Sequence, residues 1–288
     1  MNKLDSVERK EKEPIRRIAH PAIGEIHCLN EPEARVTLHE IWDERLYFQE
    51  GISILPGDIV FDVGANIGVF TLCAAKQGAR IYAYEPIPPT FELLQHNIHL
   101  HGFENIAHAR NIGLSDRAEE RTMFHYPALS VCDSWTAQDS WFELMAEEWE
   151  NTLDILKTAN PDQYKAIRSL GSKSQQQGAV REIIDGISAS PVRIKCKFDT
   201  LSGVIAQENV QSIGLLKLDA ERADWEILNG VKAEDWNRIR QVAMEVHVQS
   251  DVASISAFLS GRGFSHVAGK QLKMATSCVW ASKITRAP

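Results

Sequence analysis

The fold class is indicated most clearly by residues 57–86, which read GDIVFDVGANIGVFTLCAAKQGARIYAYEP. This stretch begins with an apolar run at residues 59–63 that ends at a glycine, which is typical of a buried parallel strand. The chain turns at Gly64 and continues as a helix-length apolar segment that closes near Gly78. A second apolar run follows at residues 81–84. The stretch therefore predicts a strand, a tight turn, a helix and a second strand, the repeating unit of an open α/β fold.

The glycines of this stretch indicate which ligand the turn binds. Gly64 lets the backbone approach a ligand closely, and Gly68 permits close packing of the following helix. The free amides at the start of that helix can face a carboxylate or a phosphate. A dinucleotide site requires G-x-G-x-x-G, whereas the spacing here is G-x-x-x-G. Because Asp62 would repel a pyrophosphate but suits the ammonium of a methionine moiety, we expect S-adenosylmethionine rather than NAD.

Further ligand contacts are expected at the ends of the next two strands. Glu85 follows Gly64 by about 20 positions, where an acid of this fold meets ribose hydroxyls. The loop after a third strand at residues 106–110 lies beside the adenine in this fold class, although an Asn-Gly loop also fits an ordinary turn. The predicted ligand contacts are Asp62, Gly64, Ala65, Asn66, Gly68, Glu85, Pro86, Asn111 and Gly113.

Four ordered motifs resemble the FkbM family of methyltransferases. They are FDVGANIGVF at 61–70, YEPIPPTFELLQHN at 84–97, LLKLDAERADWEIL at 215–228 and MEVH at 244–247. The resemblance is closest to O-methyltransferase modules of polyketide and nonribosomal peptide synthases. It implies an S-adenosylmethionine-dependent O-methyltransferase that acts on a hydroxyl of a natural-product intermediate. Arg222 departs from the pattern, since most of the family has glycine there, and this concerns the local turn.

The expected architecture is a Rossmann-like, class I methyltransferase fold, with a mostly parallel seven-stranded sheet and helices on both faces. We predict an N-terminal arm and lid segment at 1–50, a core at 51–127 and 191–288, and a helical lid inserted at 128–190. Within the insertion, residues 139–154 show helical spacing of apolar side chains. The polar run at 171–178 is expected to be a mobile loop. A side-packed helical pair or a dimer surface fits the insertion equally well.

The catalytic residues are expected where later core strands end. In open α/β sheets ligands bind beyond the carboxyl ends of the strands, so Asp219 and His247 should face the same crevice as Glu85. His247 is the predicted base that takes a proton from an acceptor hydroxyl. Glu245 or Glu221 can orient its imidazole and stabilise its charge. The alternative is that these carboxylates and the imidazole bind a divalent cation, which lowers the pKa of the acceptor hydroxyl.

Composition excludes several classes of partner. The 288 residues carry a net charge of −8 without a basic tract, so nucleic acid is not expected. Five widely spaced cysteines without a C-x-x-C pair indicate neither a disulfide framework nor a zinc site, and the cytoplasm is the expected compartment. No membrane partner is expected. The acceptor is a small molecule or is tethered to a carrier protein, and a homodimer is possible. An N-methyltransferase and a non-catalytic binding partner of the same fold are the functional alternatives.

Overall fold

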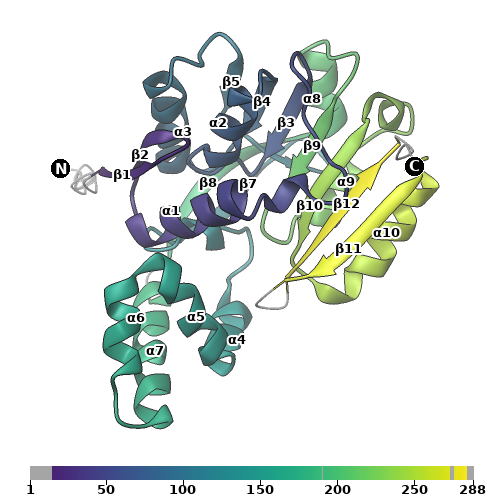
Figure 1. Ribbon diagram of the computed structural model, residues 1–288. Coiled ribbons are helices and arrows are strands. Elements are labelled where there is room, and N and C mark those ends of the chain that lie inside the picture. Colours follow the sequence, from purple (N-terminus) through teal and green to yellow (C-terminus); the bar gives the residue numbers. More distant parts are fainter. Residues whose placement is uncertain (1–14, 190, 273–275, 284–288) are drawn as a thin grey trace, which may run out of the picture.

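A seven-stranded sheet forms the centre of the molecule in the computed structural model, which describes residues 15–189, 191–272 and 276–283 (Figure 1). Its strand order is β5-β4-β3-β9-β10-β12-β11. The strands are β3 (Ile59–Val63), β4 (Arg80–Tyr84), β5 (Ala107–Arg110), β9 (Leu215–Leu218), β10 (Gln241–Val246), β11 (His266–Gln271) and β12 (Ser277–Ser282). In this sheet β5, β4, β3, β9 and β10 pair in parallel, and β12 is antiparallel to both of its neighbours. The predicted mostly parallel, seven-stranded sheet is confirmed.

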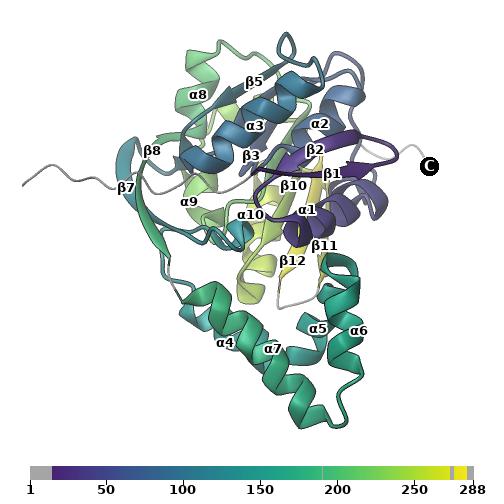
Figure 2. The same cartoon turned by 90° about the vertical axis from the view of Figure 1, so that its left-hand side faces the viewer.

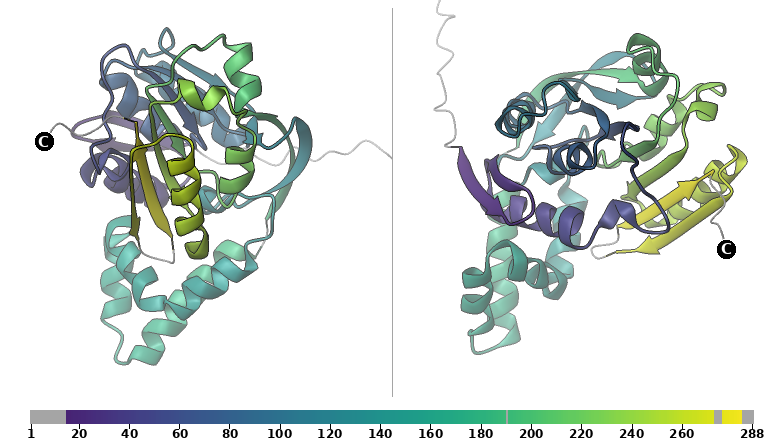
Figure 3. Two further views of the ribbon diagram at one scale, coloured as in Figure 1. Left: turned by 90° about the vertical axis from the view of Figure 1, so that its right-hand side faces the viewer. Right: turned by 45° about the horizontal axis from the view of Figure 1, so that its top comes forward.

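Helices cover both faces of this sheet because its central strands are apolar on both sides. In β3, Val60 belongs to one buried cluster and the next residue, Phe61, to the other, since successive side chains of a strand point to opposite faces. The first cluster contains α2 (Val69–Lys76) and α3 (Pro88–Leu100). The second contains α8 (Leu201–Gln207), α9 (Asp224–Asn229) and α10 (Val252–Gly261). The three layers are visible in two further views (Figure 3).

The N-terminal segment contains a hairpin and a helix. The hairpin is formed by β1 (Arg16–His20) and β2 (Gly24–Cys28), and helix α1 (Glu31–Leu38) follows it. Asn30 caps α1 by accepting a hydrogen bond from the Glu33 N–H, and a proline lies in the first turn. After α1 the chain forms a π-helical turn, η1 (His39–Asp43), and a 3₁₀ turn, η2 (Leu46–Phe48).

A separate group of helices lies below the sheet (Figures 1 and 2). We call it the helical insertion, and it comprises α4 (Asp139–Glu147), α5 (Trp149–Ala159), α6 (Pro161–Arg168) and α7 (Lys173–Ser188). It has its own buried apolar cluster. The prediction of a mobile loop at 171–178 is wrong, because α7 begins there. Ser172 caps this helix by accepting a hydrogen bond from the Gln175 N–H, so the polar residues form an exposed first turn.

The insertion is joined to the core through a three-stranded sheet in the order β6-β8-β7. Its strands are β6 (Gly113–Ser115), β7 (Glu119–His125) and β8 (Val192–Thr200). Short 3₁₀ turns are η3 (Ser130–Cys132), η4 (Asp235–Arg238) and η5 (Gln249–Asp251). No helix among the described residues is long and apolar enough to cross a membrane.

Candidate active site

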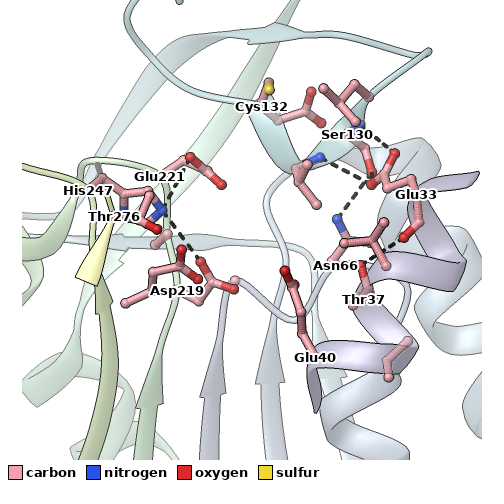
Figure 4. Close-up of a pocket in the computed structure, with 18 of the residues that line it drawn as sticks. Glu33, Thr37, Glu40, Asn66, Ser130, Cys132, Asp219, Glu221, His247 and Thr276 are labelled. Carbon is pink, nitrogen blue, oxygen red and sulfur yellow. Dashed lines mark hydrogen bonds and ion pairs between the residues drawn. The ribbon is translucent and has the colours of Figure 1, made fainter. Parts of the chain in front are cut away.

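A cavity of about 970 Å³ lies at the carboxyl ends of β3, β4, β9 and β10 and extends towards the helical insertion. Glu85 and His247 both line it, so the two ends of the proposed site open onto one space. The predicted residues that line the cavity are Gly64, Ala65, Asn66, Glu85, Pro86, Gly113, Asp219, Glu221, Glu245 and His247. Figure 4 shows His247, Asp219 and Glu221 on one side of the cavity and Asn66, Ser130 and Glu33 on the other.

The turn after β3 is held against the end of β9 and can contain only glycine at its first position. Gly64 has φ +72°, and a Cβ there would lie 1.7 Å from the Asp219 carbonyl oxygen. The amides of Gly64 and Ala65 both donate to the carbonyl oxygen of Tyr84, at 3.1 and 3.0 Å. This close approach of two strand ends places the cavity-lining residues of both strands together.

Glu85 is held by backbone amides at the same end of the cavity. Its carboxylate oxygens accept hydrogen bonds from the N–H groups of Asn66, at 3.0 Å, and Ile87, at 2.9 Å. Burial raises the pKa of Glu85 to about 8, and the neighbouring Asp133 acts in the same direction. Each carboxylate oxygen still has a free lone pair, so the group can accept further bonds from a ligand.

Three of the predicted ligand contacts do not line the cavity. Asp62 has no exposed surface, and its carboxylate accepts a hydrogen bond from the Thr71 hydroxyl at 2.6 Å. Gly68 packs against α3, where a Cβ would lie 2.7 Å from Leu94 Cδ1. Asn111 donates its amide protons to the backbone carbonyls of Glu85 and Pro86. These residues support the site from behind, so their predicted direct contact with the ligand is corrected.

Lys217 lines the cavity and is a site residue that sequence reasoning missed. Its side chain is 2% exposed, and its ammonium lies 3.2 Å from Asp62 Oδ1 and 3.7 Å from Asp219 Oδ2. It also donates to the Gly64 carbonyl at 2.8 Å, which fixes the turn. Burial disfavours the ammonium, but the two carboxylates outweigh it and raise the pKa of Lys217. The available signal was a single lysine within the apolar strand LLKL.

His247 lies at the end of β10 among acidic side chains. Its Nε2 lies 3.4 Å from Glu221 and 3.8 Å from Asp219, and its Nδ1 lies 3.6 Å from Asp224. Burial alone would lower the pKa of His247, but Glu221 and Asp224 outweigh burial and raise it well above its usual value. Asp224 was not predicted, although an acid in the first turn of a helix after β9 is visible in the sequence.

The acidic side chains around His247 form a compact set. Asp219 Oδ2 accepts a hydrogen bond from the Tyr47 hydroxyl at 2.8 Å, so this tyrosine combines a buried ring with a polar contact at the site. Burial and the charge of Asp219 raise the pKa of Glu245 to about 8. Single ligand atoms of Asp219, Glu245 and His247 lie within 4.8 Å of one another. Two carboxylates and an imidazole are a donor set that can hold a divalent cation.

On the opposite side of the cavity, α1 is tied to the turn after β3. Glu33 accepts hydrogen bonds from the backbone N–H of Ser130, at 2.8 Å, and from its hydroxyl, at 2.5 Å. The Asn66 side-chain amide donates to the same hydroxyl at 3.1 Å. Glu33, Ser130 and Asn66 therefore connect α1, the segment that leads into the insertion and the turn after β3 (Figure 4).

The strand order, the glycine turn and the acid after β4 define a Rossmann-like, class I methyltransferase. Residues 62–265 match the family model described as the Methyltransferase FkbM domain, so the chain belongs to the FkbM family of methyltransferases. The departure at Arg222 has a visible consequence, because this residue adopts φ +68°, a conformation that favours glycine. Family membership makes the protein a methyltransferase and implies S-adenosylmethionine as the methyl donor.

Three relatives give this assignment its context. The chain is 33% identical to the 31-O-demethyl-FK506 methyltransferase FkbM of Streptomyces tacrolimicus, and the alignment covers 83% of this chain and 85% of that protein. It is 26% identical to Methyltransferase sdnD of Sordaria araneosa, and that alignment covers 83% of this chain and 85% of that protein. It is 29% identical to part of the AMB antimetabolite synthetase AmbE of Pseudomonas aeruginosa, where 81% of this chain matches only 10% of the synthetase.

Proposed function

We propose that this enzyme is an O-methyltransferase that acts on a hydroxyl group of a natural-product intermediate of the polyketide or peptide type. The observation that carries the proposal is His247, an imidazole that lines the same cavity as the Gly64 turn. The names of the relatives support an oxygen acceptor and natural-product chemistry, since they include a 31-O-demethyl-FK506 methyltransferase and an antimetabolite synthetase. A carrier-tethered acceptor is compatible with the second of these.

The cofactor end of the site is assigned to the turn after β3 and the end of β4. Glu85 would accept bonds from the ribose hydroxyls, beside Ala65, Asn66 and Pro86. When bound, S-adenosylmethionine supplies an electrophilic methyl group and its sulfur keeps the electron pair of the broken bond. Lys217 holds the Gly64 carbonyl in place and neutralises Asp62, so it acts as a positioning residue. The protein thereby supplies a preformed geometry, which is the main need of a displacement reaction.

His247 would take the proton of the acceptor hydroxyl. Only the neutral imidazole can do so, and the carboxylates of Glu221 and Asp224 favour the charged form. A cationic ligand in the cavity opposes them, because a nearby positive charge lowers the pKa of an imidazole. Once protonated, the imidazolium is stabilised by the same two carboxylates. A general base of this kind contributes roughly 10²–10⁴-fold to the rate.

The test is the pair of variants His247→Gln and His247→Ala, with 31-O-demethyl-FK506 as the first acceptor and a matched set of small alcohols and amines as further acceptors. We expect kcat for alcohol methylation to fall by about 10²-fold or more, while S-adenosylhomocysteine binds with unchanged affinity by calorimetry. An amine acceptor needs little help from a base. Methylation of amines alone, with His247→Ala fully active, would therefore overturn the proposal in favour of an N-methyltransferase.

A divalent cation at Asp219, Glu245 and His247 is the second mechanism, favoured by the short separation of their ligand atoms. It ranks lower because Asp219 is already bonded to Tyr47 and lies 3.7 Å from the Lys217 ammonium, which would repel a dication. Treatment with EDTA distinguishes the two mechanisms. Activity that survives EDTA supports the metal-free base, whereas loss followed by rescue with Mg²⁺, Mn²⁺ or Zn²⁺ supports the cation.

A further inference from the structure

The cavity does not end at the catalytic side chains but continues into the helical insertion. Helix α7 contributes two isoleucines, Ile183 and Ile187, that are only half-buried and line the cavity. Their neighbours on the same helix, Val180 and Ile184, are fully packed into the apolar cluster of the insertion. Because these four residues recur at spacings of three and four, one face of α7 forms both the core of the insertion and a wall of the cavity.

Two other helices of the insertion complete this wall. Met145 of α4 and Leu156 of α5 are half-buried, line the cavity and pack against the same apolar cluster. Trp141 of α4 lies among them. We call Trp141, Met145, Leu156, Ile183 and Ile187 the apolar lobe. The opposite wall comes from α1, which packs against α5 and adds Val36. Figure 2 shows α1 above the helices of the insertion.

The two ends of the cavity differ in chemistry. The end at the sheet carries Asp219, Glu221, Glu245 and His247, whereas the lobe consists of aliphatic side chains, a thioether and an indole ring. The polar lining residues of the insertion, Thr152, Asp154, Thr158 and Gln163, come from α5 and α6 rather than from α4 or α7. The volume of about 970 Å³ is at the upper end of the range of about 300–1,000 Å³ for ligand sites. It therefore leaves room for a second large molecule beside the methyl donor.

Half-buried apolar side chains that face a cavity gain free energy when another apolar group covers them. We propose that the apolar lobe binds a saturated hydrocarbon chain of the acceptor, and that Ile183 and Ile187 set the length of chain that fits. The enzyme would then methylate a hydroxyl group carried on, or next to, an extended aliphatic segment. The inference rests on the proposed function for the hydroxyl, but the lobe can be tested without methyl transfer.

The test uses a homologous series of n-alkan-1-ols, from 1-butanol to 1-dodecanol, as probes of the protein saturated with S-adenosylhomocysteine. Binding is followed by displacement of 1-anilinonaphthalene-8-sulfonate and by the tryptophan fluorescence to which Trp141 contributes. We expect the affinity to rise about fourfold for each added methylene and to level off when the lobe is full. Affinity that is independent of chain length would overturn the proposal.

Variants place the effect at the lobe. Ile183→Phe adds a ring inside the lobe, so the affinity should level off at a shorter chain. The control is Glu182→Phe, which adds a ring at the neighbouring exposed position of α7. It should leave the dependence of affinity on chain length unchanged. If Ile183→Phe lost S-adenosylhomocysteine binding, Ile187→Phe would serve instead. If the affinity depended on chain length in the same way in the wild type and in both lobe variants, the inference would be refuted.

The outcomes for the lobe and for the proposed function are separable. Chain-length-dependent binding without methylation of the alkanols, together with methylation of n-alkylamines, would retain the lobe and refute the O-methyltransferase proposal. Methylation of small alcohols, together with an alkanol affinity that is independent of chain length, would retain the O-methyltransferase proposal and refute the lobe.

Discussion

The two ends of the cavity are built in different ways. At the sheet, Gly64, Glu85 and Lys217 are each held by specific polar contacts, and the strand ends approach so closely that a side chain at Gly64 has no room. In the helical insertion, the cavity wall is built on a buried apolar cluster, and half-buried apolar side chains face the cavity. Polar contacts have strict geometry and apolar packing tolerates changes of shape. The difference supports our proposals that the chemistry takes place at the ends of the core strands and that the insertion selects the acceptor.

The largest effect is expected for Gly64→Ala. The added Cβ meets the Asp219 carbonyl at 1.7 Å in a backbone conformation of φ +72°, so both overpacking and backbone strain oppose it. We expect a loss of about 4 kcal/mol or more in stability and no S-adenosylhomocysteine binding. Gly57→Ala is the control, because Gly57 has φ +85° but nothing within 4 Å, and it should cost only about 1–2 kcal/mol. Equal losses by chemical denaturation would contradict the close-approach argument.

Lys217→Met is expected to cost about 3–4 kcal/mol, because it leaves the buried Asp62 carboxylate without its cationic partner. The double variant Lys217→Met/Asp62→Asn removes the unpaired charge and should recover much of that loss. A double-mutant cycle from urea unfolding measures the coupling between the two residues. Additive effects would show that the pair does not stabilise the site as a unit.

Leu153→Ala tests the other side of the comparison. Leu153 is 1% exposed within the apolar cluster of the insertion and does not line the cavity. We expect a cost of about 2–3 kcal/mol that is confined to α4–α7, seen as faster hydrogen exchange in these helices. S-adenosylhomocysteine affinity should stay unchanged, as in the exposed control Lys157→Ala. A parallel loss of cofactor affinity would mean that the insertion and the core do not act separately.

The smallest effect is a pH dependence at Glu85. Its pKa is raised to about 8 by burial, so the free protein carries a neutral carboxyl at pH 7 and an ionised one at pH 9. Only the ionised form makes charge-assisted hydrogen bonds with ribose hydroxyls. S-adenosylhomocysteine affinity should therefore rise about tenfold between pH 7 and 9, relative to Glu85→Gln, whose side chain stays uncharged over this range. Parallel curves for the two proteins by calorimetry would remove Glu85 from this role.

Several features of the fold could be predicted because their causes are local. The apolar run before Gly64 and the helix after it mark a buried strand and its turn within 30 residues of sequence, and both were found. The prediction for the polar run at 171–178 was wrong, because composition alone indicates a loop. In the structure Ser172 caps a helix, and the apolar face of that helix comes from later residues, Val180 and Ile184. Such a helix is stabilised by tertiary packing rather than by propensity.

The first two core strands, the glycine turn, the acid after β4 and the histidine after β10 could be predicted from the sequence, because each is marked by residues that are neighbours along the chain. How these groups face one another depends on tertiary contacts between distant segments. Asp62 was assigned to a ligand because its partner Lys217 lies far away in sequence and comes opposite it only through the pairing of β3 with β9. The apolar lobe was likewise invisible, since hydrophobic periodicity does not distinguish a helix face that meets another helix from one that borders a cavity.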